Sequence, residues 1–176
     1  MSVLDLRSLL AALDEHEVRF VVIGGVAVGA HGYVRATEDL DIVPDPSAEN
    51  LSRLARALAE LQATLPLAEN RVFQPAGELT ALKRRRNMTL ATRHGALDIV
   101  QQAAGVPSFG QLDEEAVESE LLGVPVRVCS LAHLRAMKDA RGSAQDKADL
   151  EALPRRFPVT GDLTASEAIE EDRGES

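Results

Sequence analysis

Two aspartates, Asp39 and Asp41, lie one residue apart in the segment TEDLDIV, which otherwise has the pattern of a buried strand. Side chains alternate across a strand, so both carboxylates are expected on one face, with Leu40 and Ile42 on the other. Two like charges held side by side repel each other, and burying them is unfavourable unless positive charge lies between them. Taken alone, the pair is also consistent with an edge strand whose carboxylates face water.

A third aspartate and a glycine pair occur in matching contexts. Asp98 lies in ALDIV, which repeats the LDIV of residues 40–43, and the pair Gly24 and Gly25 ends the apolar run VRFVVI. We expect a short helix to begin at the glycines, so that free backbone N–H groups face whatever lies above the turn. Three carboxylates on adjacent strands beside a glycine turn would form a hard-oxygen site suited to Mg²⁺.

The elements expected around these residues are helices with an apolar stripe and short β-branched strands. Strands are predicted at 18–23, 39–43, 96–100 and 123–130, with residues 78–100 holding two or three strands in all. Helices are predicted at 4–13, 26–32, 47–61, 131–141 and 144–153. This order predicts an α/β (α+β) fold, with a mixed β-sheet flanked by helices and short C-terminal helices.

The chain has 176 residues, which is enough for one domain with a proper core and too short for two comfortable ones. We expect one domain over residues 1–153, with a core of about 1–130 and C-terminal helices over about 131–153. Residues 154–176 are polar and acidic, and we expect them to form a flexible tail.

Composition limits the classes of function. With 19 basic and 28 acidic residues, the net charge of −9 argues against a broad, nonspecific nucleic-acid surface and leaves a local basic patch open. The single cysteine, Cys129, excludes an internal disulfide and suits a reducing compartment. No apolar run reaches the length of about eighteen residues that spans a bilayer. We therefore expect a soluble, cytoplasmic protein with no membrane partner.

The segment IGGVAVGAHGYVRATEDLDIV resembles the signature of the nucleotidyltransferases of the DNA polymerase β superfamily. More narrowly, it resembles the minimal bacterial forms grouped with the AbiEii toxins of abortive-infection and toxin–antitoxin systems. A second segment, LRAMKDARGSAQDKADLEAL, is similar to the helical ending of those proteins, so the resemblance spans about residues 20–153. The first motif is G-G followed by H-G-x-x-R-x-T-x-D-x-D, here Gly24, Gly25, His31, Gly32, Arg35, Thr37, Asp39 and Asp41.

Two positions depart from the family pattern. Val26 follows the glycine pair where the wider superfamily often has a serine that helps to hold a phosphate, so this grip would fall to backbone amides. Gln145 directly precedes Asp146, at a position where the family usually has a basic residue before the aspartate of its penultimate helix. The role of that helix end is therefore open.

The resemblance implies an enzyme that moves a nucleoside monophosphate from a nucleoside triphosphate to an acceptor hydroxyl and releases pyrophosphate. Asp39, Asp41 and Asp98 would be the catalytic residues and the metal ligands, holding two Mg²⁺ ions, with Mn²⁺ as an alternative. Asp98 would also take up the proton of the acceptor hydroxyl. The predicted nucleotide-binding residues are Gly24, Gly25, Arg35, Thr37, Lys138, Arg141 and Asp146.

Several of these residues have simpler explanations. Lys138 and Arg141 are also consistent with a solvated helix edge, and Thr37 with support of the loop before the aspartates. His31 is at least as well explained by a structural hydrogen bond as by catalysis. Asp146 would serve equally as a helix cap.

The sequence leaves the acceptor and the partners open. The resemblance points to an RNA 3′ end such as that of tRNA, or to a protein side-chain hydroxyl, and a toxin would have a cognate antitoxin as partner. The run KRRR, Lys83 to Arg86, is either a solvated loop or the grip for a polynucleotide. The alternatives are an enzyme that modifies a small molecule such as an antibiotic, and a non-catalytic, antitoxin-like binding module with the same fold.

Overall fold

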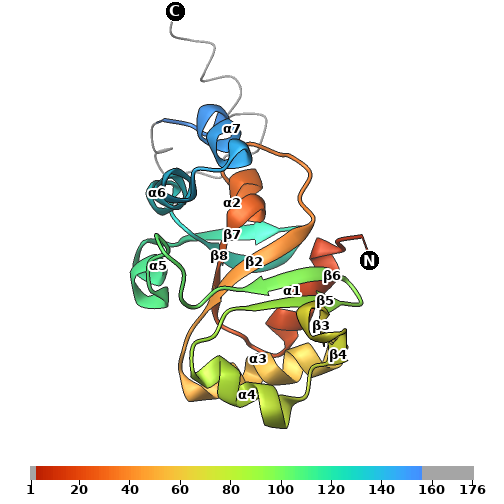
Figure 1. Cartoon of the computed structure of the whole chain (residues 1–176). Helices are drawn as coiled ribbons and strands as arrows, with labels where there is room; N and C mark the ends of the chain where they lie inside the picture. Colours follow the sequence, from red (N-terminus) through yellow and green to blue (C-terminus); the bar gives the residue numbers. More distant parts are fainter. Residues whose placement is uncertain (1–2, 156–176) are drawn as a thin grey trace, which may run out of the picture.

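The computed structural model describes residues 3–155, which form one eight-stranded mixed β-sheet with helices on both faces (Figure 1). The strands are β1 (Phe20–Ile23), β2 (Asp39–Pro44), β3 (Thr64–Leu65), β4 (Arg71–Val72), β5 (Met88–Thr92), β6 (Gly95–Ile99), β7 (Val117–Leu121) and β8 (Val124–Val128). Their order across the sheet is β4-β3-β5-β6-β2-β1-β8-β7. Strand β2 runs antiparallel to β1 and parallel to β6, so the predicted mixed sheet is confirmed.

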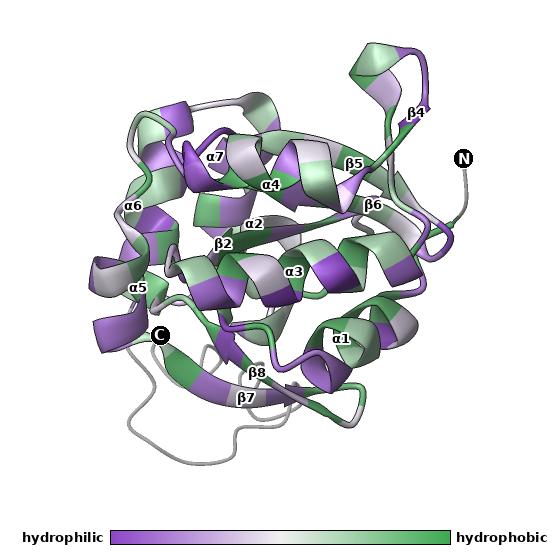
Figure 2. Ribbon diagram, turned by 90° about the horizontal axis from the view of Figure 1, so that it is seen from below, coloured by the Kyte–Doolittle hydropathy of each residue, from purple (hydrophilic) through white to green (hydrophobic). Residues whose placement is uncertain are grey.

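The helices lie on both faces of this sheet. They are α1 (Leu6–Glu15), α2 (Gly24–Ala30), α3 (Ala48–Glu60), α4 (Pro75–Lys83), α5 (Phe109–Glu115), α6 (Leu131–Arg141) and α7 (Ala144–Ala152), with a 3₁₀ turn at Pro66–Ala68. Helices α1, α3 and α4 cover one face, and α2, α6 and α7 lie on the other (Figures 1 and 2). The predicted short C-terminal helices are thus confirmed as α6 and α7.

The core is built from leucine stripes packed on alternate strand positions. The ribbons of α1 and α3 carry both hydrophilic and hydrophobic residues (Figure 2), and the leucines of their apolar stripes are buried. Leu40 and Ile42 of β2 are fully buried, whereas the aspartates between and beside them are only partly buried. Burying a leucine or isoleucine side chain contributes about 1.5–3 kcal/mol. The same alternation that fills the core therefore places Asp39 and Asp41 on the opposite face of β2.

The middle of the chain departs from the prediction. Residues 78–100 hold the two strands β5 and β6, but their first part belongs to helix α4. Pro75 occupies the first turn of this helix, where its missing N–H leaves no donor unpaired. The Glu78 side chain accepts a hydrogen bond from the Gln74 backbone N–H at 2.7 Å and pairs with Arg71. The helix is therefore fixed by contacts with the preceding chain that its weak apolar stripe does not reveal.

Helix α5 and strand β7 were not predicted. The signal for α5 is a capping box, in which the hydroxyl of Ser108 accepts a hydrogen bond from the Gln111 backbone N–H and the Gln111 side chain accepts one from the Ser108 backbone N–H. Strand β7 pairs antiparallel with β8 at the edge of the sheet. Its sequence, VESEL, is mostly exposed, so it lacks a strong apolar alternation.

Within residues 3–155, no helix is long and apolar enough to cross a membrane. The tail predicted over residues 154–176 lies outside the described residues except for its first two positions.

Candidate active site

Strands β2 and β6 bring the three predicted carboxylates together. The parallel register places Asp41 opposite Asp98 and Leu40 opposite Leu97, so the two LDIV segments lie side by side in step. One carboxylate oxygen from each of Asp39, Asp41 and Asp98 lies within 4.8 Å of the other two. The spacing inferred from the sequence is therefore a real cluster of three oxygens on one face of the sheet.

This cluster is electrostatically strained without a cation. Burial, together with the neighbouring charges of Asp39 and Asp98, raises the pKa of Asp41 to about 7. Burial also raises the pKa of Asp98, with the charge of Asp39 adding to the rise and the Thr89 hydroxyl opposing it. The Oδ1 atom of Asp98 is buried and has no hydrogen-bond partner among the described residues. A buried acceptor without a partner is unfavourable, so this donor set fits a bound cation.

The glycine turn packs directly against this cluster. Gly24 has φ +70°, and a Cβ atom there would lie 2.1 Å from Oδ2 of Asp41. A Cβ atom on Gly25 would lie 2.8 Å from Oγ1 of Thr37 and 3.3 Å from Nη1 of Arg35. Helix α2 begins at Gly24, and its N-cap residue, Ile23, makes no side-chain hydrogen bond to the first turn. The turn must therefore be glycine for the carboxylate and the arginine loop to approach it.

The loop before β2 is fixed by its own side chains. The Thr37 hydroxyl donates to the backbone carbonyl of Asp39 at 3.2 Å. This contact supports the loop before the aspartates, which is one of the two roles that the sequence suggested for Thr37. His31 Nε2 lies 2.8 Å from the backbone carbonyl oxygen of Cys129, so His31 joins α2 to the end of β8. His31 thus has a structural hydrogen bond.

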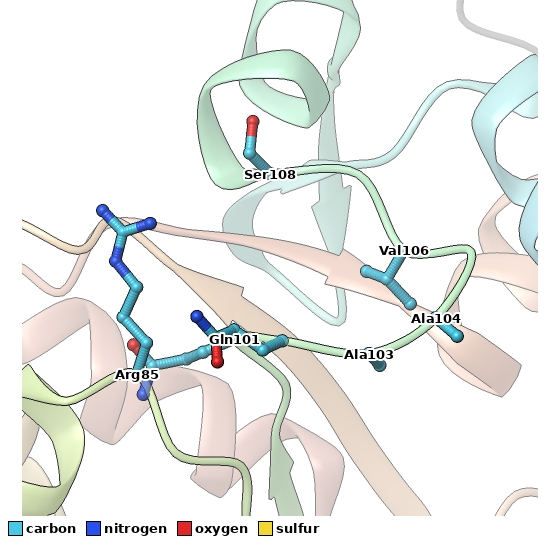
Figure 3. A pocket seen from close by; sticks show the side chains of 7 residues that line it. Arg85, Gln101, Ala103, Ala104, Val106 and Ser108 are labelled. Carbon is cyan, nitrogen blue, oxygen red and sulfur yellow. The ribbon is translucent and has the colours of Figure 1, made fainter.

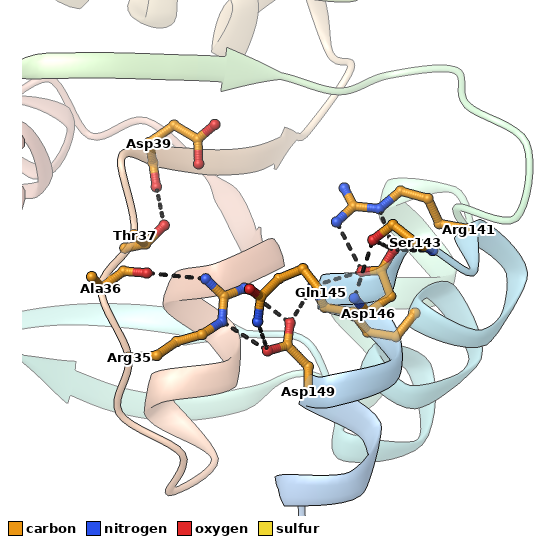
Figure 4. A network of polar contacts seen from close by, with 10 residues as sticks. Arg35, Ala36, Thr37, Asp39, Arg141, Ser143, Gln145, Asp146 and Asp149 are labelled. Atoms are coloured by element: carbon orange, nitrogen blue, oxygen red, sulfur yellow. Dashed lines mark hydrogen bonds and ion pairs between the residues drawn. The ribbon is translucent and has the colours of Figure 1, made fainter.

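The remaining predicted residues lie on α6 and α7. The Nζ atom of Lys138 lies 3.0 Å from Oδ1 of Asp146 and 2.9 Å from Oδ2 of Asp149, and the Lys138 side chain is 4% exposed. Arg141 donates two hydrogen bonds to Asp146, and Arg35 donates two to Asp149 (Figure 4). Lys138 is therefore not part of a solvated helix edge, and Arg35 is joined to the C-terminal helices.

Two further residues belong to this site. Thr89 of β5 stands opposite Asp98 and acts on its pKa. Thr92 pairs with Gly95 across the tight β5–β6 hairpin, and this pairing sets the register that brings Thr89 opposite Asp98. The short hairpin is the sequence feature from which Thr89 could have been predicted. Gln145, at the position that departs from the family pattern, donates to Oδ1 of Asp149 at 2.9 Å.

The basic run Lys83–Arg86 is exposed at the junction of α4 and β5. Gln101 Nε2 donates to the backbone carbonyls of Leu82 and Arg86, at 3.2 and 3.0 Å. Asn87 bonds to the backbone of residues 101 and 102, just past the end of β6. The run is therefore held next to residues 101 and 102, which follow β6, the strand that carries Asp98. An open hollow of about 530 Å³ lies here (Figure 3), lined by Arg85, Gln101, Gln102, Ala103, Ala104, Val106 and Ser108.

We expect the affinity for a divalent cation to rise with pH up to about 7 and then level off. The cation competes with the proton on Asp41, whose pKa is raised to about 7. Each pH unit below that value should weaken binding by up to about tenfold. Titrating Mn²⁺ by electron paramagnetic resonance from about pH 5.5 to about pH 8.5 measures this profile. An affinity that stays constant over the range would contradict it.

Comparisons with known proteins give the fold a precedent. Neither a protein-family model nor a curated protein matches the sequence. A "putative nucleotidyltransferase" of Thermotoga maritima, TM1012, superposes with a TM-score of 0.52 at 15% identity, over 86% of this chain and 95% of that one.

Two structures of ANT(2″)-Ia superpose less closely. One, in complex with adenylyl-2″-tobramycin, gives a TM-score of 0.45 at 16% identity, over 84% of this chain and 93% of that one. The other is a solution structure of this antibiotic-resistance factor, with a TM-score of 0.46 at 17% identity, over 84% and 88%. The likeness to TM1012 supports the predicted nucleotidyltransferase fold. The narrower AbiEii-like assignment stays a prediction.

Proposed function

We propose that this chain is an Mg²⁺-dependent nucleotidyltransferase that moves a nucleoside monophosphate from a nucleoside triphosphate to an acceptor hydroxyl. The observation that carries the proposal is the convergence of Asp39, Asp41 and Asp98 within 4.8 Å, directly against the Gly24 turn. The shared fold with TM1012 is consistent with it. A non-catalytic binding module would have no need of a strained cluster of acceptors.

The three carboxylates would hold Mg²⁺, with Mn²⁺ as a substitute, because carboxylate oxygens are the ligands these ions prefer. When bound, two such ions would neutralise charge on the triphosphate, activate the acceptor hydroxyl and stabilise the leaving pyrophosphate. The protein's part is to keep the oxygens together on two hydrogen-bonded strands, β2 and β6.

We assign Asp98 as the acceptor of the substrate proton. Its Oδ1 is buried and has no hydrogen-bond partner among residues 3–155, and burial raises its pKa. The acceptor oxygen forms a bond to the α-phosphorus, the bond between that phosphorus and the α–β bridging oxygen breaks, and pyrophosphate leaves. The acceptor proton would pass to Asp98, which lies opposite Asp41 in the register of β2 and β6.

The nucleotide would be held by the glycine turn and by two guanidinium groups. Gly24 and Gly25 allow backbone N–H groups to approach the phosphates, with no side chain in the way. Arg35 adjoins Gly25, and the Arg141 side chain is 66% exposed. A guanidinium presents several N–H donors, so each can contact phosphate while it is paired with a carboxylate. Thr37 would support the loop that carries Arg35.

For the acceptor we favour a polynucleotide such as tRNA. The exposed basic run Lys83–Arg86 is the one dense positive segment of an acidic chain, and its anchor, Gln101, follows Asp98 by three residues. Phosphate groups of an RNA docked there would approach the carboxylates along the end of β6. A protein hydroxyl and a small molecule are the other candidates. If the chain is a toxin, its partner would be a cognate antitoxin in the cytoplasm.

The transfer reaction is tested with nucleoside triphosphates labelled at the α- or the γ-phosphate. The protein is incubated with each of the four nucleotides, Mg²⁺, and total cellular RNA or protein. The α-label should appear on the acceptor, the γ-label should leave as pyrophosphate, and chelation of the metal should stop both. Transfer of the γ-label would indicate a kinase, and no transfer with any acceptor would favour the binding module.

Neutralising two of the basic residues, in an Arg85→Gln/Arg86→Gln variant, should weaken RNA labelling at least about tenfold at moderate salt. It should also reduce the slope of log affinity against log salt by about one to two. Each phosphate contact that is lost no longer releases counterions when the RNA binds. An Arg7→Gln/Arg56→Gln variant removes two exposed charges from α1 and α3 and serves as the control. Equal RNA labelling by both variants would show that the run Lys83–Arg86 does not bind the RNA.

A further inference from the structure

A line of alternating charges joins the loop before β2 to the C-terminal helices (Figure 4). We call this line the ion-pair clasp; in order, its members are Arg35, Asp149, Lys138, Asp146 and Arg141. Every neighbouring pair in it is separated by 2.7–3.0 Å. The clasp therefore ties three separate segments, the loop, α6 and α7, at one place.

The middle of the clasp is buried and fully paired. The side chains of Asp146 and Asp149 are 0% exposed, and Lys138 lies between them at 4%. Asp146 also accepts hydrogen bonds from the Ser143 backbone N–H and hydroxyl, and Asp149 from Gln145. These contacts hold the pKa values of both aspartates below the usual range. Two buried carboxylates that stay ionised are firm anchors for the cations at the two ends.

The two ends of the clasp reach toward the candidate active site. Arg35 Nη1 would touch a Cβ atom on Gly25, so this guanidinium borders the glycine turn. Arg141 ends helix α6, which packs against α2, the helix that begins at the glycine turn. The Nε and Nη2 atoms of Arg141 donate hydrogen bonds to Asp146, and its Nη1 makes no hydrogen bond with any described residue. Donors for an anionic ligand are thus left at this end.

We propose that Lys138, Asp146 and Asp149 are positioning residues that aim the guanidinium groups of Arg35 and Arg141 at the triphosphate of a bound nucleotide. This inference rests on the proposed function. In this proposal the two groups of residues have different roles. The clasp sets the affinity for the nucleotide, and the strand carboxylates set the affinity for the metal. Lys138 does not touch the substrate; it holds the two carboxylates that orient the arginines.

Charge balance supports this division. The clasp holds three cations and two carboxylates, so it presents one net positive charge to the site. A bidentate carboxylate fixes the plane of each guanidinium without cancelling the donors that point away from it. Pre-orienting the arginines in this way lowers the entropy lost on binding a flexible triphosphate.

The test compares Asp149→Asn and Lys138→Met with the parent, using whichever of ATP, GTP, CTP and UTP the parent transfers. We expect KM for that nucleotide to rise at least about tenfold, with kcat changed by less than about threefold. Mn²⁺ affinity without nucleotide, measured by paramagnetic resonance, should stay within about twofold of the parent. Asp139→Asn, at an exposed position of the same helix α6, is the matched control and should change neither constant.

A double-mutant cycle separates positioning from loss of folding. Combined with Arg35→Gln, Asp149→Asn should add less than about twofold to the rise in KM, because both changes disable the same guanidinium. Fully multiplicative effects, an unchanged KM in both single variants, or a fall in kcat alone would overturn the proposal. Loss of Mn²⁺ binding in Asp149→Asn would also overturn it. If the parent itself transfers no nucleotide, the failure lies with the proposed function instead.

Discussion

An Asp41→Asn variant is expected to lose nucleotidyl transfer by about a thousandfold or more and yet to be more stable than the parent without metal at about pH 8. Asparagine keeps the shape of the side chain and removes one negative charge from the cluster with Asp39 and Asp98. Loss of a metal ligand removes several kcal/mol of transition-state stabilisation, which corresponds to about three orders of magnitude in rate. Without a bound cation, the same charge is repelled by the neighbouring carboxylates and lowers the stability of the folded protein.

The gain in stability should depend on pH. The pKa of Asp41 is raised from 3.8 to about 7 by folding, so the folded state holds a proton that the unfolded state releases between these values. The free energy of unfolding of the parent should therefore fall as the pH rises from about 4 to about 7, and the penalty should be complete above about 7. Asparagine has no such titration, so its advantage should vanish near pH 4.

Melting temperatures in the presence of a chelator, at about pH 5 and about pH 8, measure this difference. Glu38→Gln is the control, because Glu38 is exposed and lies between Thr37 and Asp39 without joining the cluster. Full transfer activity in Asp41→Asn would show that this carboxylate is not catalytic. A loss of stability at both pH values would show that its charge is not strained.

A methyl group at position 24 is expected to have the second large effect. In Gly24→Ala, the new Cβ atom would lie 2.1 Å from Oδ2 of Asp41, and φ is +70°. The left-handed conformation alone costs a non-glycine residue about 1–2 kcal/mol. The carboxylate would also have to move away from the glycine turn, so we expect Mn²⁺ affinity to fall at least about tenfold and transfer to fall with it.

The control for this change lies in the same helix. A Cβ atom on Gly29 would meet nothing within 4 Å, so Gly29→Ala should keep metal affinity and slightly raise the melting temperature. Isothermal titration with Mn²⁺ and thermal melting of both variants give the comparison. Equal Mn²⁺ affinity in the two variants would mean that the turn does not set the position of the Asp41 carboxylate.

The carboxylate site was predictable because it depends on local rules. Alternation along a strand places Asp39 and Asp41 on one face, and the repeated LDIV segment marks two strands with matching buried positions. These strands proved to be neighbours in register, with Asp41 opposite Asp98. The glycine turn was likewise visible, since a short apolar run ending in paired glycines leaves few other conformations.

The clasp was not predictable in the same way. The sequence places Lys138 and Arg141 on one helix, but the burial of Lys138 depends on two aspartates from α7 and on the packing of α6 against that helix. The pairing of Arg35 with Asp149 spans 114 positions in the chain, so no local pattern encodes it. Helix α4 was missed for a different reason: its apolar stripe is weak, and its buried Glu78 is paired with Arg71 and Gln74, which precede the helix.

The proposed metal centre is tested most directly by counting bound Mn²⁺ with paramagnetic resonance at about pH 8. The parent, Asp39→Asn and Asp98→Asn are measured with and without a non-hydrolysable nucleoside triphosphate. We predict that the parent binds Mn²⁺, that the nucleotide tightens this binding, and that each substitution weakens it at least about tenfold. Mn²⁺ binding by both variants at the affinity of the parent would contradict a metal centre formed by Asp39, Asp41 and Asp98.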